Sequence, residues 1–407
     1  MLRNVLGLLV CALAILTAPA SGEVLYGADG AQGNSSNLYT LNPATGAVVS
    51  TVGTIGFPVT GLAIHPITRV MYGATGNKGV NHPRTLITVN TTTGAGTVVG
   101  SFSFPDDDQT LTDLTFASDG TLYGLGSGDG QLYRVNLVTG EATVIGQNNE
   151  LAPFGGGLAA DPCDTIYVAP NSDLGLIFTV NRFTGAVVPG AQLQGETGNA
   201  LSAMAFNSAG TLYGSLLNTN TTPAAASLVT INPLTGAMVT LGATVPRLDA
   251  IVFDGQFPAA NLSLTLGLNQ PTVAPGGHVQ LGVTVANPAG AAAFDLFFAV
   301  LIPPATSIQL GCPAGDGIVF LANGFSTAQT TCVSTIALPI LQPLYGNVCI
   351  PAGLPATNVP NLFSLTWPAV PAGKYSFVML ATPVGAFARS AVEIRALSLV
   401  DLQASSP

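Results

Sequence analysis

The chain has 407 residues, of which 48% are hydrophobic and 7% charged, and its formal net charge at pH 7 is −10. With only 10 lysines and arginines, it lacks the cationic surface needed to bind nucleic acid or anionic lipid, and both classes of partner are excluded. Its 48 glycines and 29 prolines separate short apolar runs, which is typical of an all-β protein with more than one domain.

Residues 1–20 are predicted to be a signal peptide. Arg3 gives a positively charged start, residues 5–16 form an apolar stretch, and Ala18-Pro19-Ala20 fits a cleavage site of the A-x-A type. The apolar stretch is too short for a stable membrane anchor. We therefore expect a secreted protein, extracellular or periplasmic, with no stable membrane span in the mature chain.

A turn motif recurs five times between residues 42 and 236. It begins with Asn, ends with Thr-Gly, and first appears as Asn42-Pro43-Ala44-Thr45-Gly46, and its glycines stand at positions 46, 94, 140, 185 and 236. Asparagine opens such a turn by bonding to its own backbone, and glycine supplies the positive φ where a hairpin closes. The period, roughly 45–51 residues, is that of a β-propeller blade.

Each turn belongs to a unit of four predicted strands. An alternating strand such as residues 38–41 precedes the turn, and a β-branched strand follows it. A small apolar strand such as residues 61–64 comes next, and a Leu-Tyr-Gly strand such as residues 25–27 completes the set. Four strands in each of five repeats predict a five-bladed β-propeller over residues 21–255. We expect the small apolar strand to be innermost and the repeated tyrosines to pack between blades.

The phase of the repeat predicts how the ring closes. The repeat region begins with a Leu-Tyr-Gly strand at Leu25 and ends with an apolar strand at residues 251–253, so neither end has a complete blade. Pairing the two ends in one sheet would complete the fifth blade and remove two exposed strand edges.

Residues 23–255 resemble bacterial extracytoplasmic propellers of the YVTN/quinoprotein-like group, in which a strand, an N-x-x-T-G hairpin and a short Val/Thr strand repeat. The YVTN tetrapeptide itself is absent. The resemblance implies the propeller fold and a bacterial source. It does not imply one activity, because the group includes binders of sugars, peptides and cofactors.

A different pattern follows the repeats. Residues 256–260 are predicted to be a linker, and residues 261–407 hold about seven alternating strands separated by Pro/Gly turns. This pattern predicts an immunoglobulin-like (Ig-like) β-sandwich and resembles the Ig-like accessory modules of exported bacterial proteins. The stretch from Cys312 to Cys349 is rich in Gly, Ser and Thr, and we expect it to be a long loop.

Four cysteines remain after the signal peptide, namely Cys163, Cys312, Cys332 and Cys349. An even number in an exported protein predicts disulfides, with three possible connectivities. Because three of the four lie in the C-terminal part, we expect a local bridge there and predict Cys312–Cys332. A metal site is the alternative, but no C-x-x-C or His-x-His spacing supports it.

The starts of the innermost strands are the candidate ligand face of the propeller. The residues predicted to face a ligand there are Thr60, Thr112, Asp113, Ser202 and Asp249. Glycosidase chemistry needs a matched pair of carboxylates, and no histidine lies where a triad could form. We therefore predict a monomeric, non-catalytic binding or scaffold protein that needs no cofactor and recognises a protein or glycan ligand.

One acidic cluster supports an alternative. Asp106, Asp107 and Asp108 lie in the connection to an inner strand, and Asp113 follows closely. Ca²⁺ binds such carboxylates readily, although the spacing matches no EF-hand or RTX loop, and a solvated acidic loop is the favoured interpretation of the cluster. The alternative function is a metal-dependent hydrolase or lactonase-like enzyme that holds its metal with residues 106–108, Asp113 and Asp249.

Overall fold

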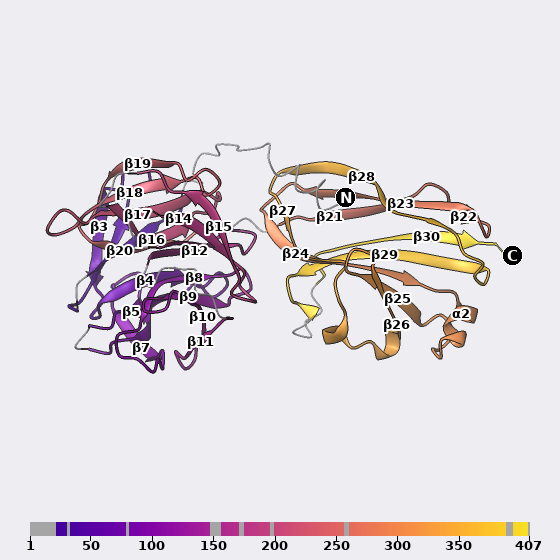
Figure 1. Cartoon of the computed structure of the whole chain (residues 1–407), viewed down its shortest axis with the longest axis horizontal. Helices are drawn as coiled ribbons and strands as arrows, with labels where there is room; N and C mark the ends of the chain where they lie inside the picture. Colours follow the sequence, from indigo (N-terminus) through magenta and orange to yellow (C-terminus); the bar gives the residue numbers. More distant parts are fainter. Residues whose placement is uncertain are drawn as a thin grey trace. The chain divides into compact units, whose positions relative to one another are not determined.

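The computed structural model describes residues 22–30, 33–78, 81–146, 156–170, 175–195, 199–255, 260–387 and 394–405. The chain divides near residue 257 into two compact units, shown in Figure 1, and each is described by itself. The predicted signal peptide and nearly all of the predicted linker lie outside the described residues. Within the described ranges, no helix is long and apolar enough to cross a membrane.

The first unit contains five four-stranded antiparallel sheets within its described residues. Sheet 1 is β20 (Leu248–Phe253), β1 (Leu25–Asp29), β2 (Asn37–Leu41) and β3 (Val48–Thr54); sheet 2 is β4 (Val59–Ile64), β5 (Met71–Thr75), β6 (Thr85–Val89) and β7 (Gly96–Ser101). Sheet 3 is β8 (Leu111–Phe116), β9 (Leu122–Gly126), β10 (Leu132–Val135) and β11 (Ala142–Val144); sheet 4 is β12 (Gly156–Ala160), β13 (Ile166–Pro170), β14 (Leu176–Val180) and β15 (Val187–Gln192). Sheet 5 is β16 (Asn199–Phe206), β17 (Leu212–Asn218), β18 (Ala225–Ile231) and β19 (Met238–Ala243).

The first strand of each sheet as written above is called its inner strand. Each inner strand contacts the inner strand of the next sheet, and β20 contacts β4. The predicted pairing of the two ends of the repeat region is confirmed, because β1 pairs antiparallel with β20 from Leu25↔Phe253 onward. The prediction of an all-β, propeller-like arrangement is thus confirmed.

Apolar side chains fill the space between neighbouring sheets. Five separate clusters of buried residues each draw on two adjacent sheets. The tyrosines of the Leu-Tyr-Gly strands join these clusters, as predicted; they are Tyr26, Tyr72, Tyr123, Tyr167 and Tyr213. The cores between sheets therefore hold the unit together, and shorter side chains occupy the axis.

The repeated turns have the geometry that the motif predicts. Each Asn side-chain oxygen accepts the N–H group two residues later at 2.8–3.0 Å, and each closing glycine has a φ between +70° and +81°. A Cβ atom on any of these glycines would lie 1.9–2.8 Å from backbone at the outer edge of the neighbouring sheet. The glycine therefore serves both the turn and the approach of one sheet to the next.

The described residues of the second unit form two sheets. One has the order β21 (Ser263–Leu268), β23 (His278–Asn287), β28 (Leu354–Thr366). The other has the order β22 (Thr272–Val273), β30 (Ala396–Ala404), β29 (Gly373–Pro383), β24 (Ala292–Leu301), β25 (Gly317–Ala322), β26 (Thr327–Cys332), with β27 (Tyr345–Ile350) also on β24. Leu281, Phe298, Trp367 and Phe377 lie in the buried core of this unit.

The stretch from Cys312 to Cys349 is not the long loop that we expected. It contains β25, β26 and much of β27, together with the short 3-10 helices Val333–Thr335 and Leu338–Ile340. β25 is a short continuous apolar run that its Gly/Ser/Thr-rich surroundings obscure in the sequence. The predicted Cys312–Cys332 disulfide is confirmed and joins the turn after α2 (Pro304–Gln309) to the end of β26. Cys163 and Cys349 are not free thiols either.

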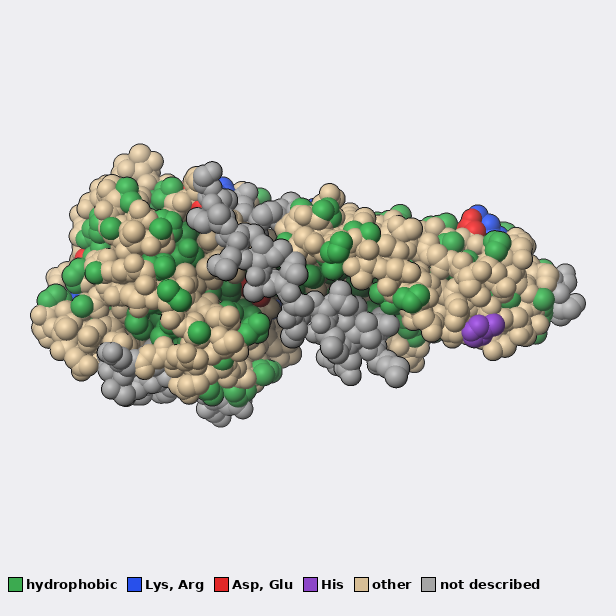
Figure 2. Space-filling view, turned by 90° about the horizontal axis from the view of Figure 1, so that it is seen from above, with side chains coloured by type: hydrophobic (Ala, Val, Ile, Leu, Met, Phe, Trp, Pro, Cys, Tyr) green, Lys and Arg blue, Asp and Glu red, His purple; other side chains and the backbone are tan. Residues whose placement is uncertain are grey.

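Charged side chains are sparse on the surface. Figure 2 shows only scattered Lys, Arg, Asp and Glu side chains on the visible face, between many uncharged ones. This agrees with the 7% of charged residues in the sequence.

The turn glycines give a matched test of sheet packing. Gly140→Ala would place a Cβ 2.2 Å from the Gly100 carbonyl oxygen, whereas Gly210 has a similar φ of +81° and no atom within 4 Å. We expect Gly210→Ala to lower the free energy of unfolding by about 1–2 kcal/mol through backbone strain alone, and Gly140→Ala by about 2–4 kcal/mol. Chemical denaturation measures both, and equal losses would contradict the inter-sheet contact.

Candidate functional site

The hydroxyl groups at the starts of the inner strands join neighbouring sheets. The Thr60 Oγ1 donates to the Leu111 carbonyl oxygen at 2.7 Å, and the Ser202 Oγ donates to the Leu248 carbonyl oxygen at 2.8 Å. The Thr112 Oγ1 makes a longer contact of 3.5 Å with the Gly156 carbonyl oxygen. In each case the acceptor lies on the inner strand of the next sheet. Three of the five residues predicted to face a ligand are therefore engaged in holding the ring together.

Asp113 occupies the position where the other inner strands have Gly61, Gly157, Ala203 and Ala250. Space there is very limited, because a Cβ on Gly61 would lie 2.6 Å from the Asp113 Cα. The Asp113 side chain is fully buried. One long side chain and four very small ones thus fill the middle of the ring.

The Asp113 carboxylate binds backbone from three sheets. Its Oδ1 accepts the Leu114 N–H at 2.9 Å, and its Oδ2 accepts the Leu158 N–H at 2.8 Å and the Met204 N–H at 3.2 Å. Burial raises the pKa of Asp113 well above its ordinary value; these three N–H groups oppose the rise, and Asp249 adds to it. Asp249 is therefore near enough to raise the pKa of Asp113 by its charge.

Asp249 differs from Asp113 in the surroundings of its carboxylate. It is partly exposed and has no hydrogen-bond partner within the described ranges. Desolvation nonetheless raises its pKa to about 7. Gly30 packs against it so closely that a Cβ there would lie 2.8 Å from Oδ2. Asp249 therefore changes its charge near neutral pH.

The acidic cluster does not assemble the predicted metal site. The Asp107 carboxylate pairs with Arg84 at 2.7 Å, and its side chain is 93% exposed. Arg84 also donates to the backbone oxygen of Asp106, and Asn77 to that of Asp108. Among the described residues, no three acidic, His or Cys side chains are grouped so that they could hold a metal ion. The cluster is a solvated loop neutralised in part by Arg84.

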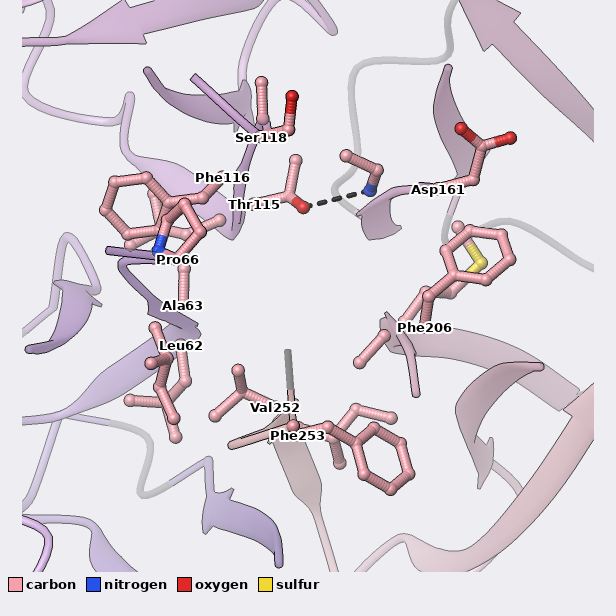
Figure 3. Close-up of a pocket in the computed structure, with 18 of the residues that line it drawn as sticks. Leu62, Ala63, Pro66, Thr115, Phe116, Ser118, Asp161, Phe206, Val252 and Phe253 are labelled. Carbon is pink, nitrogen blue, oxygen red and sulfur yellow. Dashed lines mark hydrogen bonds between the residues drawn. The ribbon is translucent and has the colours of Figure 1, made fainter. Parts of the chain in front are cut away.

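A cavity of about 320 Å³ opens at the opposite ends of the inner strands. Residues from all five inner strands line it, and in Figure 3 Leu62, Phe116, Phe206, Val252 and Phe253 surround the empty centre. Our sequence analysis missed this site, because it looked for a ligand only where the inner strands begin. The available signal was the last position of four of these strands, which holds Ile64, Phe116, Phe206 and Phe253.

Tyrosines support the aromatic wall of this axial cavity. Tyr72 packs on Phe116 with ring centroids 5.7 Å apart, Tyr167 on Phe206 at 5.6 Å, and Tyr213 on Phe253 at 4.9 Å. In each pair the tyrosine comes from the sheet before the one that carries the phenylalanine. The contacts restrict the phenylalanine rings and keep the hollow open.

Most polar side chains of the axial cavity are already engaged. Ser118 donates its N–H and its hydroxyl to Asp164, and Asp161 accepts the N–H groups of its own turn. Burial raises the pKa of Asp161 to about 6, and its carboxylate points away from the centre in Figure 3. Arg69 also lines the cavity, and it has no ion pair within the described ranges.

A buried ion cluster fixes one side of the rim. Arg182, whose side chain is 3% exposed, lies 3.0 Å from an Asp119 carboxylate oxygen and 3.2 Å from an Asp164 oxygen. The two aspartates belong to the turns that follow β8 and β12. Burial alone would raise the pKa of Asp119, but Arg182 and the Thr121 N–H leave it lower than usual. The rim is therefore rigid here.

Several solved structures resemble part of this chain at low identity. A virginiamycin B lyase from Staphylococcus aureus is 10% identical, with a TM-score of 0.33, and the match covers 77% of this chain and 85% of that one. A gluconolactonase from Xanthomonas campestris is 12% identical, with a TM-score of 0.35 and coverages of 56% and 78%. A luciferin-regenerating enzyme is 11% identical, with a TM-score of 0.36 and coverages of 65% and 88%.

A Bacteroides thetaiotaomicron protein of unknown function is 13% identical with a TM-score of 0.36, and the match covers 47% of this chain. This chain spans about half (53%) of that protein's length. No protein-family model and no curated protein matches the sequence. Of the resemblance drawn from the repeats, the propeller-like fold is the part that the sheets of this chain show.

The expectation that this protein is not an enzyme is corrected by the comparison, because three of the structures that it resembles are named as enzymes. The sequence shows where carboxylates stand along the chain but not how deeply they are buried, and burial brings Asp249 to a pKa of about 7. The non-catalytic interpretation is withdrawn.

Proposed function

We propose that this protein is exported and binds a small, mainly apolar ligand in the axial cavity of a five-bladed propeller. The observation that carries the proposal is the cavity itself, with walls from all five inner strands. Its volume of about 320 Å³ falls at the lower end of small-molecule sites, which are usually about 300–1,000 Å³ and mostly apolar.

The lining favours a ligand over a solvated surface depression. Phe116 and Phe206 are partly exposed although both end a buried strand. Leaving such rings in water costs roughly 25 cal/mol per Å² of apolar surface, and a ligand would recover that free energy. Because tyrosines hold the rings in place, the walls of the cavity do not move together to bury this apolar surface without a ligand.

The architecture supports the rest of the proposal. Five four-stranded sheets with five cores between them support five blades over residues 21–255. Two β-sheets that contribute to a shared core support an Ig-like module over residues 261–407. Disulfide-bonded cysteines are typical of oxidising compartments and support secretion. The monomeric state and a protein or glycan partner stay predictions that no observation tests.

A second candidate function is hydrolysis at the opposite end of the inner strands. The specific observation is Asp249, an uncommitted carboxyl whose pKa of about 7 suits a general base at neutral pH. Asp113 could not share the proton transfer readily, since its oxygens accept three backbone N–H groups. Over the part of the chain that the structure describes, no group of three acidic, His or Cys side chains could hold a metal ion here.

Binding in the axial cavity is tested by filling it. Val252 lines the hollow, so Val252→Phe should weaken binding of the neutral fluorophore N-phenyl-1-naphthylamine by roughly tenfold or more. Val239→Phe is the matched control, because Val239 is 62% exposed on β19. Fluorescence titration measures both affinities. Equal weakening, or none in Val252→Phe, would refute the proposed function.

The hydrolytic candidate is tested with a panel of lactones and p-nitrophenyl esters. The wild-type rate should rise as Asp249 loses its proton near pH 7, and Asp249→Asn should lower it by roughly 10²-fold or more. Asp107→Asn should leave the rate unchanged, because that side chain lies in the solvated loop. Absence of hydrolysis by the wild type would remove this candidate.

A further inference from the structure

The arginine at the rim of the axial cavity is held in an unusual way. Arg69 has a φ of +62°, in the left-handed region that non-glycine residues seldom adopt. Its N–H donates to the His65 carbonyl oxygen at 3.0 Å. Strained residues of this kind tend to lie at functional sites. The observation makes Arg69 a candidate for ligand contact.

His65 fixes the turn that presents Arg69. Its Nδ1 accepts the N–H groups of Ile67 at 3.1 Å and Thr68 at 3.2 Å, which requires an unprotonated Nδ1. Burial lowers the pKa of His65 and so favours this neutral form. The ring also lies 5.0 Å from Phe116, which is part of the cavity wall. The aromatic wall and the arginine are therefore positioned by the same residue.

The acidic groups around the rim already have donors of their own. The Glu23 carboxylate accepts the N–H and the hydroxyl of Ser208, and Asp254 accepts the Val24 N–H. Asp161 accepts two N–H groups, as described above. Arg69, by contrast, is half-buried and has no ion pair or side-chain hydrogen bond within the described ranges. The rim thus offers a cation without a partner.

Thr115 offers a second donor to the cavity. The Thr115 Oγ1 accepts the Ala160 N–H at 2.9 Å, drawn as the dashed line in Figure 3, so its own hydroxyl proton is available. Among the described side chains that line the cavity, Arg69 and Thr115 are therefore donors that have no acceptor. An acceptor carrying negative charge is the chemistry that matches them.

We infer that the ligand of the axial cavity is an amphipathic acid, with its apolar body against Phe116 and Phe206 and its carboxylate on Arg69. The inference rests on the proposed function and adds the chemical class of the ligand. A guanidinium binds a carboxylate through two parallel N–H donors, which a neutral amide or alcohol cannot match. An apolar body alone would leave Arg69 unpaired at the mouth.

The test compares octanoate with octanamide, which has nearly the same shape and no charge, by isothermal titration calorimetry on the mature full-length protein. Octanoate should bind the wild type roughly tenfold or more tightly than octanamide. Arg69→Gln should abolish this ratio while leaving octanamide affinity unchanged, and Arg69→Lys should keep part of it. Arg134→Gln, a change at an exposed arginine on β10, should keep the full ratio.

The outcomes separate the inference from the proposed function. Equal affinities of the wild type for the two probes, or a ratio that survives Arg69→Gln, would overturn the assignment of an acidic ligand while the apolar cavity stands. Failure of both probes to bind, together with no binding of N-phenyl-1-naphthylamine, would overturn the proposed function as well. Circular dichroism of each variant checks that the β structure is retained.

Discussion

The buried carboxylate of Asp113 is the interaction on which the arrangement of the inner strands depends. It accepts N–H groups from β8, β12 and β16, and two of these strands are not neighbours in the ring. Such a bond can form only because glycine or alanine stands at the same position of the other inner strands. Hydrogen bonds from three sheets to one group in a dry interior specify how the strands approach one another.

Asp113 also separates the two ends of the inner strands. At one end Asp249 is an uncommitted carboxyl among hydroxyl groups that bind the next sheet. At the other end apolar rings surround a cavity with Arg69 at its rim. Because the middle is filled, a ligand at one end does not reach the other. The two ends can therefore serve unrelated chemistry, and the variants of each can be interpreted separately.

The repeat made the strands and turns predictable, because Asn42 to Gly46 and its four counterparts encode a turn by local hydrogen bonding and positive φ. The ligand site was not predictable in the same way. Thr60 and Ser202 have the composition of a polar binding ring, but their acceptors come from neighbouring sheets and are invisible in the sequence. The unpaired state of Arg69 likewise depends on which acids find other donors. In the second unit, alternation predicted strands, but β25 and β26 were hidden in a stretch rich in Gly, Ser and Thr.

Amide hydrogen exchange at Leu158 and Met204 tests the role of Asp113 most directly, because both N–H groups donate to its carboxylate. The account predicts that both amides are among the slowest to exchange in the wild type. In Asp113→Ala they should exchange much faster relative to the Ala160 amide, whose acceptor is Thr115. Unchanged relative protection of Leu158 and Met204 in that variant would contradict the account.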